Sequence, residues 1–328
     1  MKEGKGTVLV TGGAGYIGSH TALALIEAGN SVIVLDNLST GDRDNVPAEA
    51  TFVQGDVGNV DLVSSVLTTH DIDTVMHFAG LIKVEESVRE PERYMHANVD
   101  DTRALAHHAV QKGVKHFIFS SSAAVYGNAE LNPIPENAPL HPMSPYADSK
   151  KRAEEAIAEV LRGSSTRATI LRYFNVAGCD PSGRAGYSTK DQPSSLIRTA
   201  VRALLQGAPF TIFGDKFPTP DGTCIRDFMH VSDLADAHVA ALSALEAGSL
   251  GNIYNCGSGH GYSNREVVRT VERLGQRHMD VRIGAERPGD LITAVADTTR
   301  IRAELGWKTK RSLEDMIRDE LAWTRMKL

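Results

Sequence analysis

Short apolar runs alternate with helical patterns through the first half of the chain, and this alternation limits the folds open to it. The six runs are TVLVTG, SVIVLDN, TFVQGDV, DTVMHFAG, KHFIFSSS and RATILRYFN. Runs this rich in valine, isoleucine and phenylalanine suit strands that are buried on both faces of a parallel sheet. Helical patterns lie between them, including residues 93–112 and 145–162. We therefore expect an α/β protein with a doubly wound parallel sheet.

The length of the chain, 328 residues, exceeds that of one average domain. The strand pattern loosens after Asn175, where GCDPSGRAGYSTKDQPSS predicts a long loop. We expect residues 1–175 to form the first domain and residues 176–328 to form mainly a smaller, interleaved C-terminal substrate domain. Later segments near residues 225–257 resemble a return to the first domain's sheet. A helix is expected near residues 196–206.

Composition excludes several classes of protein. The formal net charge is −6, and no basic excess points to a nucleic-acid partner. The apolar runs are too short for a signal peptide or a membrane span. The three cysteines are far apart, which favours a reducing compartment, and the histidines include no HExxH motif. We expect a cytoplasmic enzyme or binding protein without a metal site, a nucleic-acid partner or a membrane partner.

A glycine-rich stretch, TGGAGYIGSH, separates the first strand from the first helix. Gly12, Gly15 and Gly18 fit the spacing GxxGxxG. Glycines there allow a tight turn and let the backbone approach a pyrophosphate, while the start of the helix offers free N–H groups. The stretch predicts a dinucleotide site in a Rossmann-type fold. A purely structural turn is the alternative.

Acidic residues after the next strands strengthen the dinucleotide prediction. Asp36 ends the second strand, 18 residues after Gly18, where an acid can accept hydrogen bonds from ribose hydroxyls. The Asp36 carboxylate would repel a 2′-phosphate, so the pattern favours NAD over NADP. Asp36 could also be a turn residue, and that role is compatible with ribose binding. Residues 55–57 end the third strand, where adenine would lie, and residues 78–80 end the fourth, beside the pyrophosphate.

The stretch SPYADSK contains a candidate reaction centre. Of the eight tyrosines, only Tyr146 has a lysine, Lys150, four residues later. On a helix these two side chains share one face, and a nearby ammonium would lower the pKa of the phenol, which is ordinarily about 10. Ser122 ends the fifth strand, at the sheet edge where α/β proteins bind ligands. Taken alone, a tyrosine and a lysine at this spacing usually occur by chance on a helix surface, and a serine cluster usually marks only the end of a strand. The occurrence of all three after a dinucleotide loop favours a catalytic centre.

Taken together, these motifs resemble the extended short-chain dehydrogenase/reductase superfamily, and within it the UDP-glucose 4-epimerases, also called UDP-galactose 4-epimerases. The resemblance runs from the first strand nearly to the C-terminus. It rests on VTGGAGYIGSH, VLDNLSTG, HFAG, FSSSAAVYG, SPYADSK, LRYFNVAGCDPSG, DGTCIRDFMHVSDLADAHV, YNCGSG and RPGDL. It implies an NAD-dependent isomerase of galactose and nucleotide-sugar metabolism that inverts C4 of UDP-glucose and UDP-galactose through a transient 4-keto sugar and NADH. It also implies a homodimer.

The resemblance implies a role for each matching residue. Tyr146 would be the catalytic base, Lys150 its activator and Ser122 its hydrogen-bonding partner. NAD contacts are implied for Gly12, Gly15, Tyr16, Ile17, Gly18, Asp36, Asn37, Asp56, Val57, Phe78, Ala79, Gly80, Asn98, Lys150 and Phe174. Substrate contacts are implied for Ser122, Tyr146, Asn175, Leu196, Thr211, Phe213, Arg226, Arg287 and Asp290.

Sugar specificity depends on Ala294, by the same resemblance. Some relatives have a bulky tyrosine at the position of this alanine, near the 2-substituent of the sugar. Alanine leaves space that an N-acetyl group requires. We therefore expect UDP-N-acetylglucosamine and UDP-N-acetylgalactosamine to be interconverted as well. The alternative is that neighbouring side chains refill the space, because protein cores are close-packed.

Other functions stay open, including that of another NAD-dependent nucleotide-sugar epimerase. Two alternatives lie outside epimerisation. A nucleotide-sugar 4,6-dehydratase or decarboxylase begins with the same oxidation, but relatives of that kind carry an acid just after the serine. Here Ala123 and Ala124 follow Ser122, so no acid is evident for the next step. A non-catalytic NAD-binding regulator is the second alternative. Such proteins can lose the tyrosine or the lysine, whereas this chain keeps both.

Overall fold

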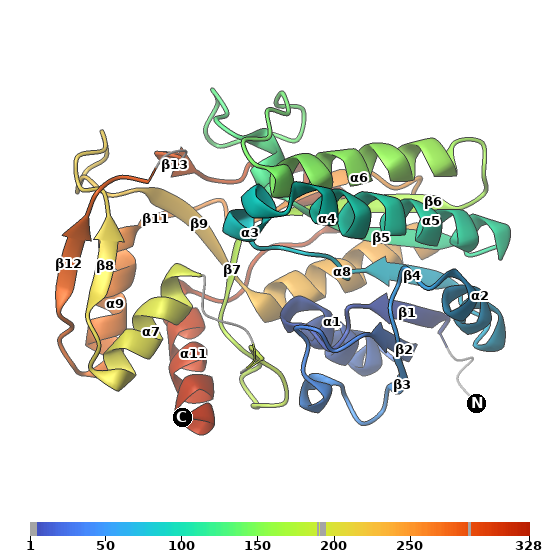
Figure 1. Cartoon of the computed structure of the whole chain (residues 1–328), viewed down its shortest axis with the longest axis horizontal. Helices are drawn as coiled ribbons and strands as arrows, with labels where there is room; N and C mark the ends of the chain where they lie inside the picture. Colours follow the sequence, from blue (N-terminus) through green and yellow to red (C-terminus); the bar gives the residue numbers. More distant parts are fainter. Residues whose placement is uncertain (1–4, 189, 191–194, 288–289) are drawn as a thin grey trace.

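The computed structural model describes residues 5–188, 190, 195–287 and 290–328. Within them, seven strands form a parallel sheet in the order β10-β6-β5-β4-β1-β2-β3 (Figure 1). These strands are β1 (Thr7–Thr11), β2 (Ser31–Asp36), β3 (Thr51–Gln54), β4 (Thr74–His77), β5 (His116–Ser122), β6 (Arg167–Tyr173) and β10 (Ile253–Cys256). The predicted Rossmann-type, doubly wound α/β fold is confirmed.

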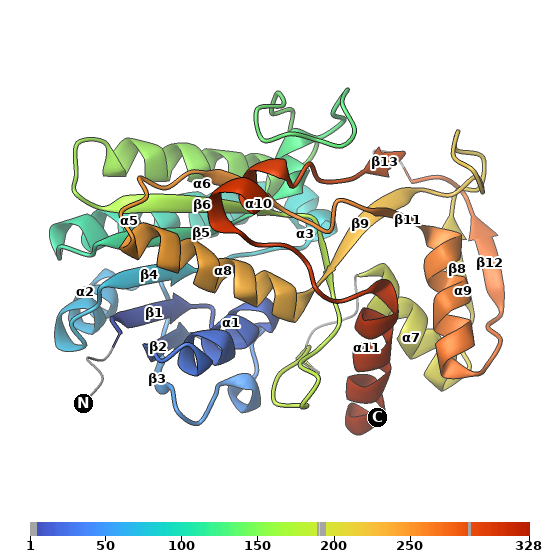
Figure 2. The same ribbon diagram turned by 180° about the vertical axis from the view of Figure 1, so that it is seen from behind.

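Helices cover both faces of this sheet. Apolar side chains of α1, α8 and α10 pack on one face of the sheet, and those of α2, α5 and α6 pack on the other. Helices α8 and α10 lie in front of the sheet in Figure 2. The central residues Val8, Leu9 and Val10 are therefore completely buried, as the continuous apolar run predicts. The bounds are α1 (Tyr16–Glu27), α2 (Val60–Thr69), α5 (Asp101–Gln111), α6 (Pro145–Leu161), α8 (Val231–Glu246) and α10 (Thr299–Leu305).

The two long helices expected in the first half differ in outcome. In α6, Ser144 caps the N-terminus by accepting a hydrogen bond from the Ala147 N–H at 3.2 Å. The helix expected over residues 93–112 is present but is not a regular α-helix throughout. It is divided into α4 (Pro91–Met95), a π-helical turn at His96–Asp100 and α5, after a short α3 (Val84–Arg89). A π-helical turn shifts the residues that follow relative to a regular α-helix.

The C-terminal part has its own core and two smaller sheets. One sheet contains β7 (Asn175–Ala177), β9 (Ile225–His230), β11 (Gly261–Ser263) and β13 (Thr293–Ala294), and the other pairs β8 (Phe210–Phe213) with β12 (Val281–Gly284). Helices α7 (Leu196–Gln206), α9 (Asn264–Gly275) and α11 (Leu313–Lys327) pack beside them (Figure 1). The short turns are Arg43–Asn45 and Ala123–Tyr126.

The segment near residues 225–257 divides between the two parts. Helix α8 packs on the central sheet and β10 extends it beside β6, but β9 pairs with β7, β11 and β13 instead. Asp227 is fully buried and accepts hydrogen bonds from Ser258, Gly259 and Ala296. A boundary at residue 175 stays a prediction.

Two further findings concern the described residues. None of their helices combines the length and the apolar character needed to cross a membrane. Nor do these residues gather three or more histidine, cysteine, aspartate or glutamate side chains where a metal ion could be held.

Candidate functional site

The glycine-rich stretch forms a cradle at the carboxyl edge of the central sheet. Gly12 has a φ of +70°, and a Cβ there would lie 2.6 Å from the Ala79 nitrogen. A Cβ on Gly18 would lie 2.3 Å from the Gly12 oxygen, so neither position accommodates a side chain. Gly15 is the N-cap of α1 and has no side chain with which to cap the helix. The N–H groups of the first turn, which Tyr16 begins, are therefore left to bind an anion, and this arrangement fits a dinucleotide pyrophosphate.

Asp36 connects this cradle to the second strand. Its carboxylate accepts hydrogen bonds from the Ala14 N–H at 3.0 Å and the Leu38 N–H at 2.8 Å. Each carboxylate oxygen keeps a further lone pair, so the group can shape the loop and still accept a ribose hydroxyl. At the more exposed end, the Asn37 amide donates to Asp56 at 2.6 Å.

The three candidate catalytic residues come from two adjacent elements. Ser122 lies at the end of β5, and Tyr146 and Lys150 lie one turn apart in α6. Ser122 is hydrogen-bonded to the Tyr146 hydroxyl, and its own oxygen accepts a bond from the Ala124 N–H at 3.2 Å. The Lys150 ammonium donates to the Ser120 carbonyl at 2.9 Å. These contacts fix both side chains of the helix against the strand end.

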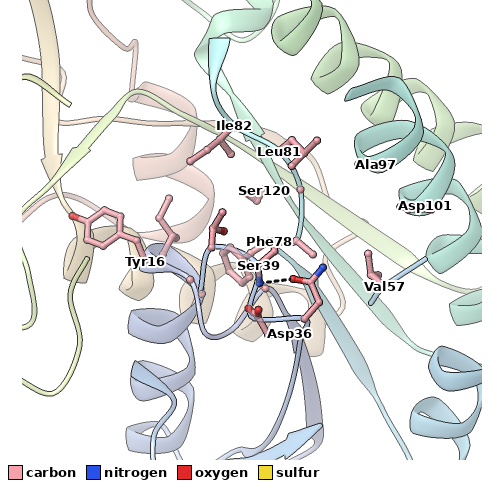
Figure 3. A pocket seen from close by; sticks show the side chains of 18 of the residues that line it. Tyr16, Asp36, Ser39, Val57, Phe78, Leu81, Ile82, Ala97, Asp101 and Ser120 are labelled. Atoms are coloured by element: carbon pink, nitrogen blue, oxygen red, sulfur yellow. Dashed lines mark hydrogen bonds between the residues drawn. The ribbon is translucent and has the colours of Figure 1, made fainter. Parts of the chain in front are cut away.

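One cavity of about 1150 Å³ joins the cradle to this catalytic group. Figure 3 shows Asp36, Phe78 and Ser120 around it. It is lined by the candidate catalytic residues and by every proposed NAD contact except Asn98. Asn98 lies in the π-helical turn and instead bonds the backbone N–H and carbonyl of Leu81, a residue that lines the cavity. Its amide also donates to Ser149, whose hydroxyl donates to the Tyr146 carbonyl.

The proposed substrate contacts do not line this cavity, apart from Ser122 and Tyr146. They gather in the C-terminal part. The guanidinium of Arg287 lies over the Phe213 ring at 3.7 Å, and Arg226 approaches Asp290 at 4.0 Å. The other residues of this group are placed on neighbouring elements, with Thr211 on β8, Leu196 at the start of α7 and Asn175 at the start of β7.

Ala294 lies beside Arg226, because β13 pairs with β9 in that register. Its side chain is buried, in a cluster that includes Tyr126, Ile134 and Phe174. The position therefore lies where this buried cluster meets the strand that carries Arg226.

Comparison with known proteins identifies the family. The sequence model of the NAD-dependent epimerase/dehydratase family matches residues 8–257, which include the cradle and the catalytic group. The chain belongs to this family. A UDP-glucose 4-epimerase of Azospirillum brasilense is 46% identical over 320 residues, which are 97% of this chain and 92% of the relative.

Solved structures of other epimerases match this chain over nearly its whole length. One is a UDP-glucose 4-epimerase of Stenotrophomonas maltophila with bound NAD and formylated UDP-arabinopyranose, with a TM-score of 0.94, 36% identity and coverage of 98% of this chain and 99% of that one. Another is the UDP-Glc/GlcNAc 4-epimerase of Campylobacter jejuni, with a TM-score of 0.86, 34% identity and coverage of 98% and 100%. NAD, the cofactor predicted from the sequence, is confirmed at the level of the family.

Electrostatics at the catalytic group of this epimerase-family chain differ from the sequence-based expectation. Burial raises the pKa of Tyr146 above its ordinary value, and the hydrogen bond from Ser122 opposes the rise. Burial also lowers the pKa of Lys150 to about 8, while the nearby Glu154 carboxylate raises it. The expected lowering of the Tyr146 pKa is therefore not met in the chain alone, because burial of the charged phenolate is the largest influence on this pKa.

Several cavity residues of this family member were missed by sequence reasoning. Tyr173 lines the floor, and its hydroxyl lies 2.6 Å from His238 Nε2. His238 Nδ1 is 2.8 Å from the Leu234 carbonyl, so Nδ1 carries the proton and the tyrosine hydroxyl is the donor. Tyr187 lines the wall. Tyr187 lies in the long loop predicted after Asn175. The length of that loop indicated a function, but no pattern in it identified Tyr187.

Proposed function

We propose that this chain is a UDP-glucose 4-epimerase. The observation that carries the proposal is the single cavity in which the pyrophosphate cradle lies beside Ser122, Tyr146 and Lys150. The names of the full-length relatives support the same activity. Ala123 and Ala124 offer no acid for the elimination step of a dehydratase, although the family includes dehydratases.

Each residue has a distinct task in the proposed reaction. Tyr146 accepts the proton of the sugar 4-hydroxyl and later returns it, which is general base and general acid catalysis. Ser122 holds the reacting hydroxyl in line with the phenol. Lys150 is fixed by the Ser120 carbonyl. Its proposed task is to favour the ionised phenol during the reaction, as a nearby positive charge does. When bound, NAD supplies the hydride transfer at C4.

The proposed substrate contacts provide the anchor about which the 4-keto sugar turns. Arg226 and Arg287 can bind a diphosphate through bidentate hydrogen bonds, because the guanidinium charge is permanent and its donors form a fixed fork. Phe213 lies under the Arg287 guanidinium and would add an aromatic side chain to this anchor. Holding the nucleotide leaves the hexose free to present either face of C4 to the same catalytic group.

We extend the proposal to N-acetyl sugars because Ala294 is small and lies beside Arg226. The Campylobacter jejuni neighbour is a UDP-Glc/GlcNAc 4-epimerase, which supports this extension. We also propose a cytoplasmic homodimer that packs through the helix faces around residues 93–112 and 145–162. The three cysteines are free and buried, in keeping with a reducing compartment.

The test is to incubate the purified protein with UDP-galactose, without added NAD, and to separate the nucleotide sugars by anion-exchange chromatography. Formation of UDP-glucose is expected. Protein that retains NAD but forms no UDP-glucose would overturn the epimerase proposal. A 4-keto-6-deoxy sugar product would instead identify a dehydratase. Sedimentation of the same sample reports the oligomeric state.

A further inference from the structure

The ring of Tyr187 is held between two other planar groups beside the cavity. It stacks on the ring of Tyr16, with centroids 3.8 Å apart and planes at 14°. The guanidinium of Arg198 lies 4.1 Å from the Tyr187 centroid. Two groups this close to one ring must occupy its opposite faces. We call the three side chains, Tyr16, Tyr187 and Arg198, the aromatic clamp.

The two ends of the aromatic clamp belong to different parts of the fold. Tyr16 is the first residue of α1, and its hydroxyl donates to the Gly178 carbonyl at 2.5 Å. Arg198 lies in α7, donates to the Ser188 carbonyl at 3.0 Å and is close enough to the buried Glu320 of α11 to lower the pKa of that carboxyl. The clamp therefore joins the cofactor cradle to two helices of the C-terminal part.

The backbone around Tyr187 is fixed from both sides as well. The Asn45 amide donates to the Gly186 carbonyl at 3.0 Å, and the Trp323 indole N–H donates to the Tyr187 carbonyl at 3.2 Å. A Cβ on Gly186 would lie 2.2 Å from the Trp323 ring. The ring of Tyr187 is thus carried by a tightly packed segment rather than by a free loop.

This arrangement bears on the cofactor because Tyr16 begins the first turn of α1, whose residues line the cavity. A ring stacked at 3.8 Å holds that turn in place and closes the wall beside it. We infer that Tyr187 is a positioning residue that retains NAD by holding Tyr16, and with it the first turn of α1, in place at the pyrophosphate cradle. The inference rests on the NAD-dependent function proposed above. It assigns a role in cofactor retention to a residue outside the sequence motifs.

The test compares Tyr187→Ala with Tyr187→Phe, which keeps both stacking faces. The NAD bound per chain is measured by chromatography of denatured, gel-filtered protein, and the dissociation constant by titrating NAD into stripped protein. Tyr187→Ala is expected to bind NAD about tenfold more weakly, a change of about 1.4 kcal/mol, whereas Tyr187→Phe should match the wild type. With saturating NAD, Tyr187→Ala should regain wild-type kcat.

Three results would overturn the inference. They are wild-type NAD affinity in Tyr187→Ala, equal loss of NAD from Tyr187→Phe, and failure of saturating NAD to restore kcat. If Tyr187→Ala does not fold, Tyr187→Leu replaces it, because leucine keeps bulk without a planar face. NAD binding needs no turnover, so the two proposals can fail separately. Wild-type protein that holds NAD but leaves UDP-galactose unchanged overturns only the epimerase function.

Discussion

The ion pair between Glu154 and Arg172 offers a sharp test of what holds the catalytic helix in place. The two side chains are buried, with 6% and 3% of their surface exposed, and form two bonds at 2.6 and 3.0 Å. Glu154 lies one turn after Lys150 in α6, and Arg172 lies in β6. The Ser121 hydroxyl also donates to the glutamate, and Arg172 donates to Tyr126. Helix and sheet are thereby joined directly behind the catalytic group.

Replacing Glu154 with glutamine keeps the shape of the side chain but leaves the guanidinium of Arg172 buried without a counter-charge. Breaking a buried pair in this way costs about 3–5 kcal/mol. For 328 residues the entropy of unfolding is about 0.7 kcal/mol/K, from about 2.1 cal/mol/K per residue. The expected fall in Tm is therefore about 4–7 °C.

The assay is thermal unfolding at pH 7 of the wild type, Glu154→Gln, Arg172→Met and the double variant, each with saturating NAD. In the double variant no buried charge is left alone, so it should be more stable than the sum of the single losses implies. A loss below about 1 kcal/mol in Glu154→Gln, together with additive effects in the cycle, would refute the reasoning.

Four further predictions follow from individual side chains. Tyr146→Phe should bind NAD as the wild type does but lower kcat for UDP-galactose by about 10² to 10⁴, and wild-type turnover would exclude the tyrosine as base. In binding titrations, Asp36→Ala should bind NAD more weakly than the wild type and should have a smaller preference for NAD over NADP. Ala294→Tyr should abolish turnover of UDP-N-acetylglucosamine in chromatographic assays and spare UDP-galactose. Burial raises the pKa of Glu320 from 4.5 to about 8, so between these values the folded chain binds more protons and stability falls as pH rises. Glu320→Gln should lack this fall. The Tm of the variant minus the Tm of the wild type should therefore increase from pH 5 to pH 8.

Local patterns predicted the parts of the fold that local chemistry determines. Continuous apolar runs gave the strands of the central sheet, and the Ser144 cap with Pro145 gave the start of α6. The glycine spacing gave the cradle because its close approaches, such as Gly12 against Ala79, exclude any side chain. These features depend on residues within a few positions of one another or on a strict steric requirement.

Features that depend on distant partners were not predicted. The helix expected over residues 93–112 is interrupted where Asn98 bonds Leu81 and Ser149, a contact that no local periodicity encodes. The pKa of Tyr146 follows burial, which the sequence alone does not measure. The segment that carries Tyr187 to the cavity is held by Asn45 and Trp323, which are both distant in the sequence.

The late position of β10 in the chain has a consequence for biosynthesis. Residues 253–256 complete the central sheet beside β6, which ends at residue 173, and α8 between them covers part of one face. At about 5–20 residues per second, a ribosome needs about 4–16 s to make the intervening chain. During that interval the emerging chain already carries the glycine cradle and Tyr146 but exposes apolar strand surface that α8 will bury.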